Sequence, residues 1–306
     1  MTRFDGPILI LVFCLSQALR DVYFAHVFQG DGFFTVVALA FSLAAAAFLA
    51  LSAWLTRGEL LRIWRHGRLV LWMNLTTALA WSCYFVGLKY VEPSVVNTIH
   101  SGMGPLTALA LGAIGGSLVD RVRVGAIERA AYVGIALSIL ALWVIVLSGA
   151  SGLGVEDRRQ TLTGLAVLFC SGASITISLL LSKKLHDAGF GSITVTAVRY
   201  LALVAVATVL ALGESRSASS SLAHAGLISI SGLALIVAPT FVLQMGVART
   251  PALLAQVVRS LGPVFVFALE LVDGRVIFSR PVLFAILVYS VSAIAATLAR
   301  RFQPAP

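Results

Sequence analysis

Charged residues are scarce in this chain, and their scarcity limits the classes of protein it can belong to. Of its 306 residues, 11% are Asp, Glu, Lys or Arg and 59% are hydrophobic. Soluble domains carry about 25% charged residues. The mean hydropathy of +0.98 is likewise typical of a chain that lies in lipid. We therefore predict an integral membrane protein whose first partner is the lipid bilayer.

Cysteine and the common catalytic motifs are also sparse. The three cysteines, Cys14, Cys83 and Cys170, lie inside apolar segments without metal-like spacing, so we expect neither a disulfide framework nor a metal site. The sequence contains no His-Glu-x-x-His motif and no Gly-x-Ser-x-Gly motif. Its net charge of +9 is explained by membrane orientation. We expect a protein that is not an enzyme, needs no cofactor and binds no nucleic acid.

Ten apolar segments are long enough to cross a bilayer as helices, which takes about 17–25 residues each. Three of them contain charges: 6–29 with Arg20 and Asp21, 188–213 with Arg199, and 250–271 with Arg259 and Glu270. This predicts an all-α membrane protein with ten transmembrane helices. The seven uncharged segments are 33–56, 69–88, 93–119, 130–153, 160–182, 217–248 and 281–299.

An internal repeat organises these segments. The repeated features are Pro93 with Gly104-Pro105 and, 158 residues later, Pro251 with Gly262-Pro263. Residues 1–153 and 159–306 then form two five-helix repeats within one integral membrane domain. Because five is an odd number, the second repeat enters the bilayer from the opposite side, as in inverted-repeat transporters. The matching Gly-Pro pairs also predict interrupted helices at Pro105 and Pro263.

The loops predict an orientation. With ten crossings, both termini share a side with loops 57–68, 120–129, 183–187 and 247–249. Lys and Arg are roughly twice as frequent on that side as on the other, which predicts cytoplasmic termini. The short loops favour a prokaryotic cytoplasmic (inner) membrane.

Charged side chains inside the predicted helices are energetically unfavourable in a membrane. Each arginine costs about 2.5–3.5 kcal/mol at the middle of a transmembrane helix. Arg20, Asp21 and Arg259 are therefore expected to face the bundle interior, whereas Arg199 either does so or snorkels to the interface. Neighbours such as Arg20 and Asp21 project about 100° apart and are expected to pair poorly. Two interpretations follow: an interhelical pair such as Asp21 with Arg259, or a guanidinium left for a carboxylate or phosphate.

Helical spacing groups polar and aromatic residues around these charges. Asn74, Thr77, Trp81 and Tyr84 share one face of segment 69–88, and Ser171, Ser174 and Ser178 favour close helix packing in segment 160–182. Asp21 and His100 are candidates for a coupling proton. The predicted substrate-binding residues are Arg20, Trp81, Tyr84, Asn97, His100, Gln256 and Arg259.

Short motifs recur across nearly the whole chain. They are Tyr84-Phe85-Val86-Gly87-Leu88-Lys89-Tyr90-Val91-Glu92-Pro93 with Gly104-Pro105-Leu106, Gly246-Val247-Ala248-Arg249-Thr250-Pro251 with Leu261-Gly262-Pro263, and Ser182-Lys183-Lys184. This pattern resembles the drug/metabolite transporter (DMT) superfamily, specifically its ten-helix EamA-type permeases. The resemblance implies a central cavity lined by helices 1, 3, 4, 6, 8 and 9. The chain departs from the family in the first helix, where Gln17, Arg20 and Asp21 replace a frequent Trp-Gly.

These observations lead to one expected function and three alternatives. We expect a secondary-active permease that exports a small anionic or zwitterionic metabolite, amino-acid-like or carboxylate, by alternating access. Arg259 and Arg20 would hold the anion, and Trp81 and Tyr84 its apolar or aromatic body. The alternatives are a cation or drug/proton antiporter using Asp21, a lipid flippase, and a membrane scaffold that transports nothing. A monomer and a homodimer are both compatible with the sequence.

Overall fold

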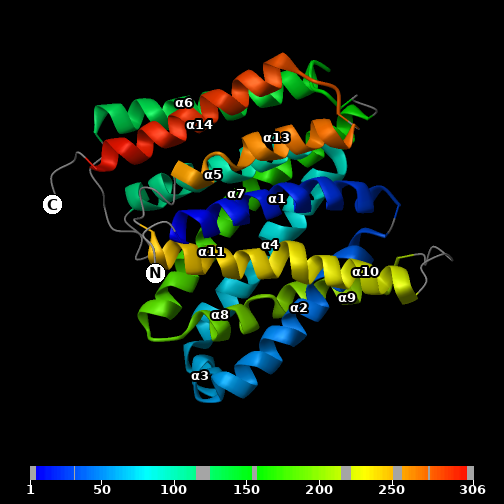
Figure 1. Ribbon diagram of the computed structural model, residues 1–306, viewed down its shortest axis with the longest axis vertical. Coiled ribbons are helices and arrows are strands. Elements are labelled where there is room, and N and C mark those ends of the chain that lie inside the picture. The colour runs from blue at the N-terminus through cyan, green and yellow to red at the C-terminus, as the bar shows by residue number, and fades with distance from the viewer. Residues whose placement is uncertain are drawn as a thin grey trace.

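The protein is built of helices (Figure 1). The computed structural model describes residues 5–30, 32–114, 125–153, 157–214, 222–250, 257–274 and 276–301, and in these ranges every regular element is helical. Within these ranges, eight helices are long and apolar enough to cross a membrane. Large apolar side chains cover the outer surface, for example Val144, Leu212 and Phe284, which are 67%, 82% and 71% exposed. The predicted class, an α-helical membrane protein, is confirmed.

The helices follow one another with short connections. The first part of the chain forms α1 (Asp5–Gly30), α2 (Phe33–Leu55), α3 (Arg57–Arg62) with a 3-10 turn (Ile63–His66), α4 (Gly67–Tyr90), α5 (Pro93–Ile114) and α6 (Ala126–Leu147). The second part forms α7 (Arg158–Asp187), α8 (Ser192–Arg199), α9 (Leu201–Ala211), α10 (Leu222–Gly232), a π-helical turn (Leu233–Val237), α11 (Ala238–Arg249), α13 (Gly262–Asp273) and α14 (Arg280–Arg301).

The helix bundle has two ends, which are defined by α1 and α14. Helix α1 begins and α14 ends on the left of Figure 1, and we call this the proximal end. The opposite end, where α1 ends and α14 begins, is the distal end.

The predicted helix 188–213 is broken at Tyr200, which separates α8 from α9. Asn74 of α4 lies against this break. Its amide nitrogen donates to the Val198 carbonyl at 2.8 Å, and its amide oxygen accepts from the Ala202 N–H at 3.0 Å. Backbone groups freed inside a membrane must find internal partners. Asn74, predicted to share the polar face with Trp81 and Tyr84, therefore serves the fold by satisfying this break.

The predicted helix break at Pro105 is wrong, because α5 continues through this residue. A proline removes only its own N–H donor to the carbonyl four residues earlier. Ser101 and Pro105 both line the cavity described below, where water can reach that carbonyl. In the second half, residues 260 and 261 form a turn and α13 begins at Gly262. Pro263 thus lies in the first turn of a helix, where its missing N–H costs little.

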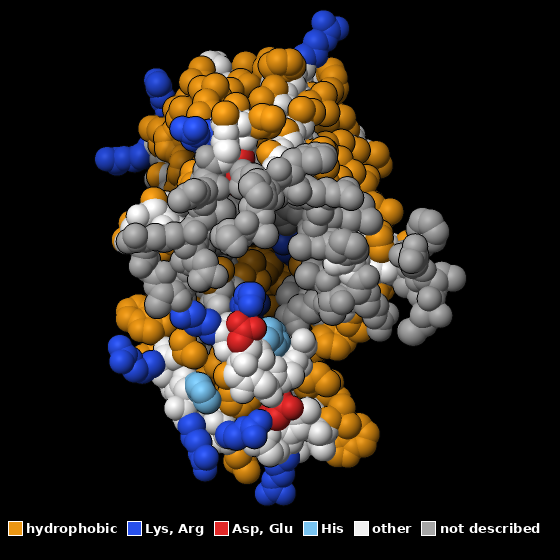
Figure 2. Space-filling model, turned by 90° about the vertical axis from the view of Figure 1, so that its left-hand side faces the viewer, with side chains coloured by type: hydrophobic (Ala, Val, Ile, Leu, Met, Phe, Trp, Pro, Cys, Tyr) orange, Lys and Arg blue, Asp and Glu red, His pale blue; other side chains and the backbone are white. Residues whose placement is uncertain are grey.

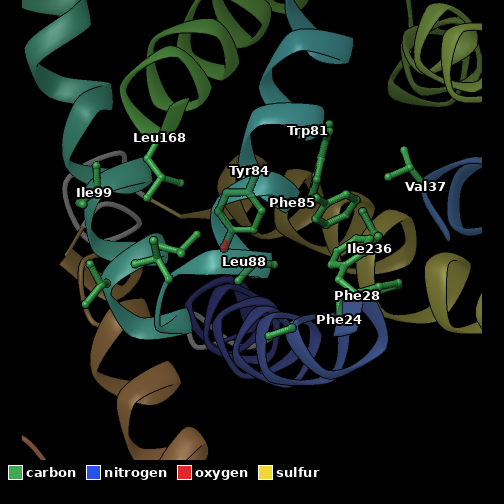
Figure 3. Packing of buried hydrophobic residues seen from close by; sticks show 14 of the residues in the cluster. Phe24, Phe28, Val37, Trp81, Tyr84, Phe85, Leu88, Ile99, Leu168 and Ile236 are labelled. Carbon is green, nitrogen blue, oxygen red and sulfur yellow. The ribbon is translucent and has the colours of Figure 1, made fainter. Parts of the chain in front are cut away.

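A cluster of aromatic side chains fills the interior toward the distal end. Figure 3 shows Phe24 and Phe28 of α1 packed near Phe85 of α4. The ring centroids of Phe28 and Phe85 are 4.9 Å apart, and those of Phe24 and Phe85 are 5.6 Å apart. These residues lie in the distal halves of their helices. The bundle is therefore tightly packed toward one end.

Candidate functional site

A cavity of about 580 Å³ lies within the bundle. Its lining includes Phe13 and Gln17 of α1, His100 of α5 and Thr297 of α14, which lie in the proximal or middle parts of their helices. Figure 2 looks at the proximal end and shows a hollow in this face, with Lys or Arg and hydrophobic side chains inside it. Among the described lining residues, three are arginines and none is Asp or Glu. The cavity therefore faces the proximal end and has a positive wall.

Arg20 and Asp21 lie at the inner end of this cavity and pair with each other. Arg20 Nε donates to Asp21 Oδ1 at 2.7 Å, and the two residues are 5% and 0% exposed. The prediction that these neighbours pair poorly is wrong. A long, flexible arginine side chain can fold back onto its neighbour, and here Tyr84 holds it there by accepting from Arg20 Nη2 at 3.0 Å.

Asp21 is further satisfied by donors from two other helices. Tyr84 of α4 donates its hydroxyl to Asp21 Oδ2 at 2.7 Å, and Asn97 Nδ2 of α5 donates to the same oxygen at 2.8 Å. Figure 3 shows the Tyr84 hydroxyl directed toward α1. This network joins α1, α4 and α5 and neutralises the aspartate. We call Arg20, Asp21, Tyr84 and Asn97 the Asp21 network.

Aromatic rings cover the guanidinium of Arg20. Its Cζ atom lies 5.1 Å from the ring centroids of both Trp81 and Tyr84. At this distance the ring faces attract a cation. The predicted substrate-binding residues Arg20, Trp81, Tyr84 and Asn97 are therefore brought together, and the first three line the cavity.

His100 lies between the Asp21 network and the cavity. Its ring centroid is 4.6 Å from that of Tyr84, and its Nδ1 is 2.8 Å from Ser171 Oγ. The Ser171 hydroxyl donates to the Ala80 carbonyl at 2.8 Å. Because a hydroxyl has one hydrogen, Ser171 accepts from His100, which places a proton on Nδ1. Ser171 was predicted to serve close packing, and it also orients this histidine.

Arg199 lines the cavity but was not among the predicted substrate-binding residues. It is 3% exposed, so the predicted alternative of snorkelling to the interface is wrong for this residue. Arg199 Nη2 donates to Ser178 Oγ at 3.1 Å, and Nε donates to Thr77 Oγ1 at 3.4 Å. In the part of the chain that the structure describes, no carboxylate forms an ion pair with it. Arg199 thus brings to the cavity wall a guanidinium whose recorded hydrogen-bond partners among the described residues are neutral hydroxyls.

Arg259 is a second cavity arginine without a carboxylate partner. It lies just before α13, is half-buried, and has no recorded hydrogen bond or ion pair within the described ranges. The alternative in which Asp21 pairs with Arg259 is wrong, because Asp21 bonds to Arg20 instead. Gln256, which was predicted to bind substrate with Arg259, and Pro251, a feature of the predicted repeat, fall outside the described residues.

The fold and the site together define a class: a polytopic α-helical membrane protein with a cation-walled internal cavity. No family model and no curated protein matches this chain. A solved structure described only as "Crystal structure of protein" superposes on it with a TM-score of 0.59 at 18% sequence identity, covering 99% of each chain. At that identity the likeness concerns the fold alone.

Proposed function

We propose that the protein is a secondary-active permease that exports a small anionic or zwitterionic metabolite by alternating access. The observation that supports this most strongly is the charge of the cavity. Arg199 and Arg259 line it without carboxylate partners in the described structure, and no described acidic side chain lines it. A guanidinium pairs with a carboxylate through two parallel hydrogen bonds. An amino-acid-like or carboxylate substrate therefore fits this cavity.

Five cavity residues have proposed roles in substrate binding. Arg199 and Arg259 bind the anionic group of the substrate, and Arg20, held by Asp21, adds to the positive potential of the inner end. Trp81 and Tyr84 present ring surfaces to the apolar or aromatic body of the substrate. His100 and Asp21 remain candidates for a coupling proton.

We also propose the ten-helix, two-repeat organisation of an EamA-type permease of the DMT superfamily. The order of elements supports it. Helices α1, α2, α4, α5 and α6 lie in residues 1–153. From residue 158 onward they are followed by α7, then α8 with α9, α10 with α11, α13 and α14. In this proposal α5 and the segment that ends with α13 also cross the bilayer. Each repeat then makes five crossings, with the second inverted relative to the first.

The orientation proposed from the positive loops places both termini in the cytoplasm. The proximal end then faces the cytoplasm of a prokaryotic cell, and the cavity is open to the side from which an exporter loads its substrate. The membrane in this proposal is the cytoplasmic (inner) membrane.

Two alternatives are less well supported. A cation or drug/proton antiporter that uses Asp21 needs a carboxylate available to the substrate, whereas Asp21 is bonded to Arg20, Tyr84 and Asn97. A scaffold that transports nothing predicts paired arginines and a filled interior, whereas Arg199 and Arg259 line a cavity.

Transport by the purified protein in proteoliposomes tests the proposal. We expect uptake of labelled carboxylates but not of cationic dyes. Arg259→Gln and Arg199→Gln are each expected to reduce carboxylate uptake by about tenfold or more, since each removes one charge-assisted contact. Arg68→Gln removes an exposed arginine of α4 and serves as the control. Uptake of dyes alone, unaffected by the cavity variants, would reject the proposed function.

A further inference from the structure

A second buried polar cluster lies at the distal end, away from the cavity. Glu92, in the connection between α4 and α5, and Glu270 of α13 are each 1% exposed. Their carboxyl groups lie within hydrogen-bonding reach of each other. Glu92 comes from the first half of the chain and Glu270 from the second. We call these two residues the glutamate pair.

Neutral donors surround the glutamate pair. The Ser94 N–H donates to Glu270 Oε2 at 3.0 Å and the Ser94 hydroxyl to Glu92 Oε1 at 3.1 Å. The Gly152 N–H donates to Glu92 Oε2 at 3.0 Å. Glu270 Oε1 is buried and has no partner among the described residues.

Cations do not compensate the glutamate pair where the structure is described. Among the described residues, the basic side chains on the flanking elements include Lys89 of α4, Arg158 and Arg159 of α7, and Arg280 of α14, and none of these four forms an ion pair with either carboxyl group. The local charge balance therefore disfavours two ionised glutamates.

Two buried carboxyl groups within hydrogen-bonding reach of each other, with no ion pair to a described basic side chain, cannot both be ionised at low cost. Burial raises the pKa of Glu92. One proton shared by the pair reduces its charge from two negative units to one. That proton also supplies an O–H donor between the two carboxyl groups, which two carboxylates lack.

The glutamate pair ties together the segments that close the distal end. It connects the start of α5, the end of α13 and, through Gly152, the chain that follows α6. Gly152 lies so close to Ile277 that a Cβ atom would be 2.1 Å from the Ile277 carbonyl oxygen. The Ile277 N–H donates to the Gly152 carbonyl at 3.0 Å, and the Ser279 hydroxyl donates to the Ala150 carbonyl at 2.7 Å. Access from this side requires these contacts to separate.

We propose that Glu92 and Glu270 form a proton-binding site that controls the opening of the distal end. Its role in transport rests on the proposed function, because alternating access requires the distal end to open. With one proton bound, an O–H···O hydrogen bond holds α5 to α13. When the proton leaves to water on the distal side, this bond is lost and two carboxylates repel each other. Rebinding of a proton from the same side restores the closed form.

Thiol labelling measures this opening without any substrate. The reporter is Val91→Cys, a buried position next to Glu92, in the full-length chain with Cys14, Cys83 and Cys170 replaced by alanine. The labelling rate of this cysteine with a membrane-impermeant maleimide is measured at each pH. It is divided by the labelling rate of a second variant, Ser148→Cys, whose cysteine is at an exposed position at the same end. The ratio of the two rates removes the effect of pH on thiol reactivity. We expect this ratio to rise by roughly tenfold between about pH 5 and about pH 9.

Two substitutions identify the groups responsible. Glu270→Gln retains a hydrogen-bond donor toward Glu92 but has no proton to lose, so the ratio is expected to stay low at every pH. Glu214→Gln is the matched control, since Glu214 is another distal carboxylate that accepts backbone N–H groups, from Phe34 and Thr35, both at 2.9 Å. It is expected to leave the pH response unchanged. An unchanged pH response in Glu270→Gln, or none in the parent chain, would overturn the proposal.

Thermal unfolding in detergent provides an independent measurement. A carboxyl group whose pKa is higher in the folded than in the unfolded state stabilises the fold at low pH, and this contribution is lost as pH rises. We expect the unfolding temperature to fall with rising pH in the parent chain and to fall less in Glu270→Gln. An equal fall in both would contradict the shared proton.

The outcomes also separate this proposal from the proposed function. If carboxylates are not transported but labelling still rises with pH and Glu270→Gln abolishes the rise, the proton site is supported and the permease proposal fails. If carboxylates are transported while labelling is independent of pH, only the proton site is overturned.

Discussion

At the scale of single residues, Tyr84 is the centre of the Asp21 network. Its hydroxyl donates to Asp21 at 2.7 Å and accepts from Arg20 at 3.0 Å, and Asn97 Nδ2 lies 3.4 Å away. An intramembrane charge needs several such contacts, because leaving one buried partner unpaired costs about 3–5 kcal/mol. The Tyr84 hydroxyl thus binds both members of the ion pair and fixes α4 against α1.

Removing this hydroxyl is expected to destabilise the protein. Tyr84→Phe keeps the ring but leaves Asp21 and Arg20 each one partner short, which we expect to cost about 1–2 kcal/mol. The check is thermal unfolding of the purified protein in detergent. Tyr90→Phe, on the same helix, removes a hydroxyl with no recorded side-chain partner in the described structure and is expected to change little. Equal effects of the two changes would contradict the role assigned to Tyr84.

Sequence spacing located part of the site and missed part of it. The three- and four-residue steps that join Thr77, Trp81 and Tyr84 do bring these residues to one side of α4, at Arg199 and the cavity. Such steps identify a helix face but not the helix that packs against it. For that reason they did not predict that Asn74 bonds to the α8–α9 break or that Arg199 meets Thr77 and Ser178.

At the scale of elements, close approach of backbones positions α2 against α10. Gly232, at the end of α10, lies where a Cβ atom would be 1.9 Å from the Ala40 carbonyl oxygen. The π-helical turn Leu233–Val237 begins immediately afterwards. Small residues let membrane helices approach closely, and van der Waals contact is a main source of their association.

A matched pair of glycines tests this contact. Gly232→Ala is expected to destabilise the protein by about 1–3 kcal/mol, because a backbone carbonyl cannot move away without shifting α2. Gly226 lies in the same helix with nothing within 4 Å of a built Cβ. Gly226→Ala is expected to be neutral or to stabilise by up to about 1 kcal/mol. Thermal unfolding of both variants is the measurement, and similar destabilisation by both would refute the close-packing explanation.

Helix existence was more predictable than helix continuity. Long uncharged runs such as 33–56 correspond closely to helices, since in lipid a helix satisfies its own backbone. The break at Tyr200 has no proline or glycine to mark it and depends on Asn74 from another helix. At Pro105 the error was the opposite, since a break was predicted where the helix continues. Proline breaks helices in many settings but is tolerated here beside a cavity.

At the scale of the whole molecule, the two ends of the bundle differ. The cavity faces the proximal end (Figure 2), while aromatic packing and the glutamate pair close the interior toward the distal end. This is the geometry expected of one state of a protein that opens alternately to either side. Composition alone predicted the membrane class, whereas the asymmetry depends on contacts between residues far apart in the chain.

The positive charge of the cavity complements the negative charge of the proposed substrate. Arg20, Arg199 and Arg259 line the cavity, and the acidic group that neutralises Arg20 is already bonded within the Asp21 network. The sequence predicted Arg259 and Arg20 as the residues that hold the anion, whereas the structure bonds Arg20 to Asp21 and adds Arg199 to the cavity wall. Arg199 and Arg259 carry positive charge that no described carboxylate offsets. The recorded partners of Arg199 are hydroxyls, and the described structure records no partner for Arg259.

The most direct test of the anion site is ligand-induced stabilisation of the purified protein, using carboxylates paired with their uncharged amides, for example phenylacetate with phenylacetamide. A ligand that binds the folded state raises the unfolding temperature with its concentration. We predict that carboxylates do so and their amides do not, and that Arg199→Gln and Arg259→Gln abolish the effect while Arg68→Gln preserves it. Equal stabilisation by acid and amide, or a carboxylate effect that survives loss of both cavity arginines, would contradict the account.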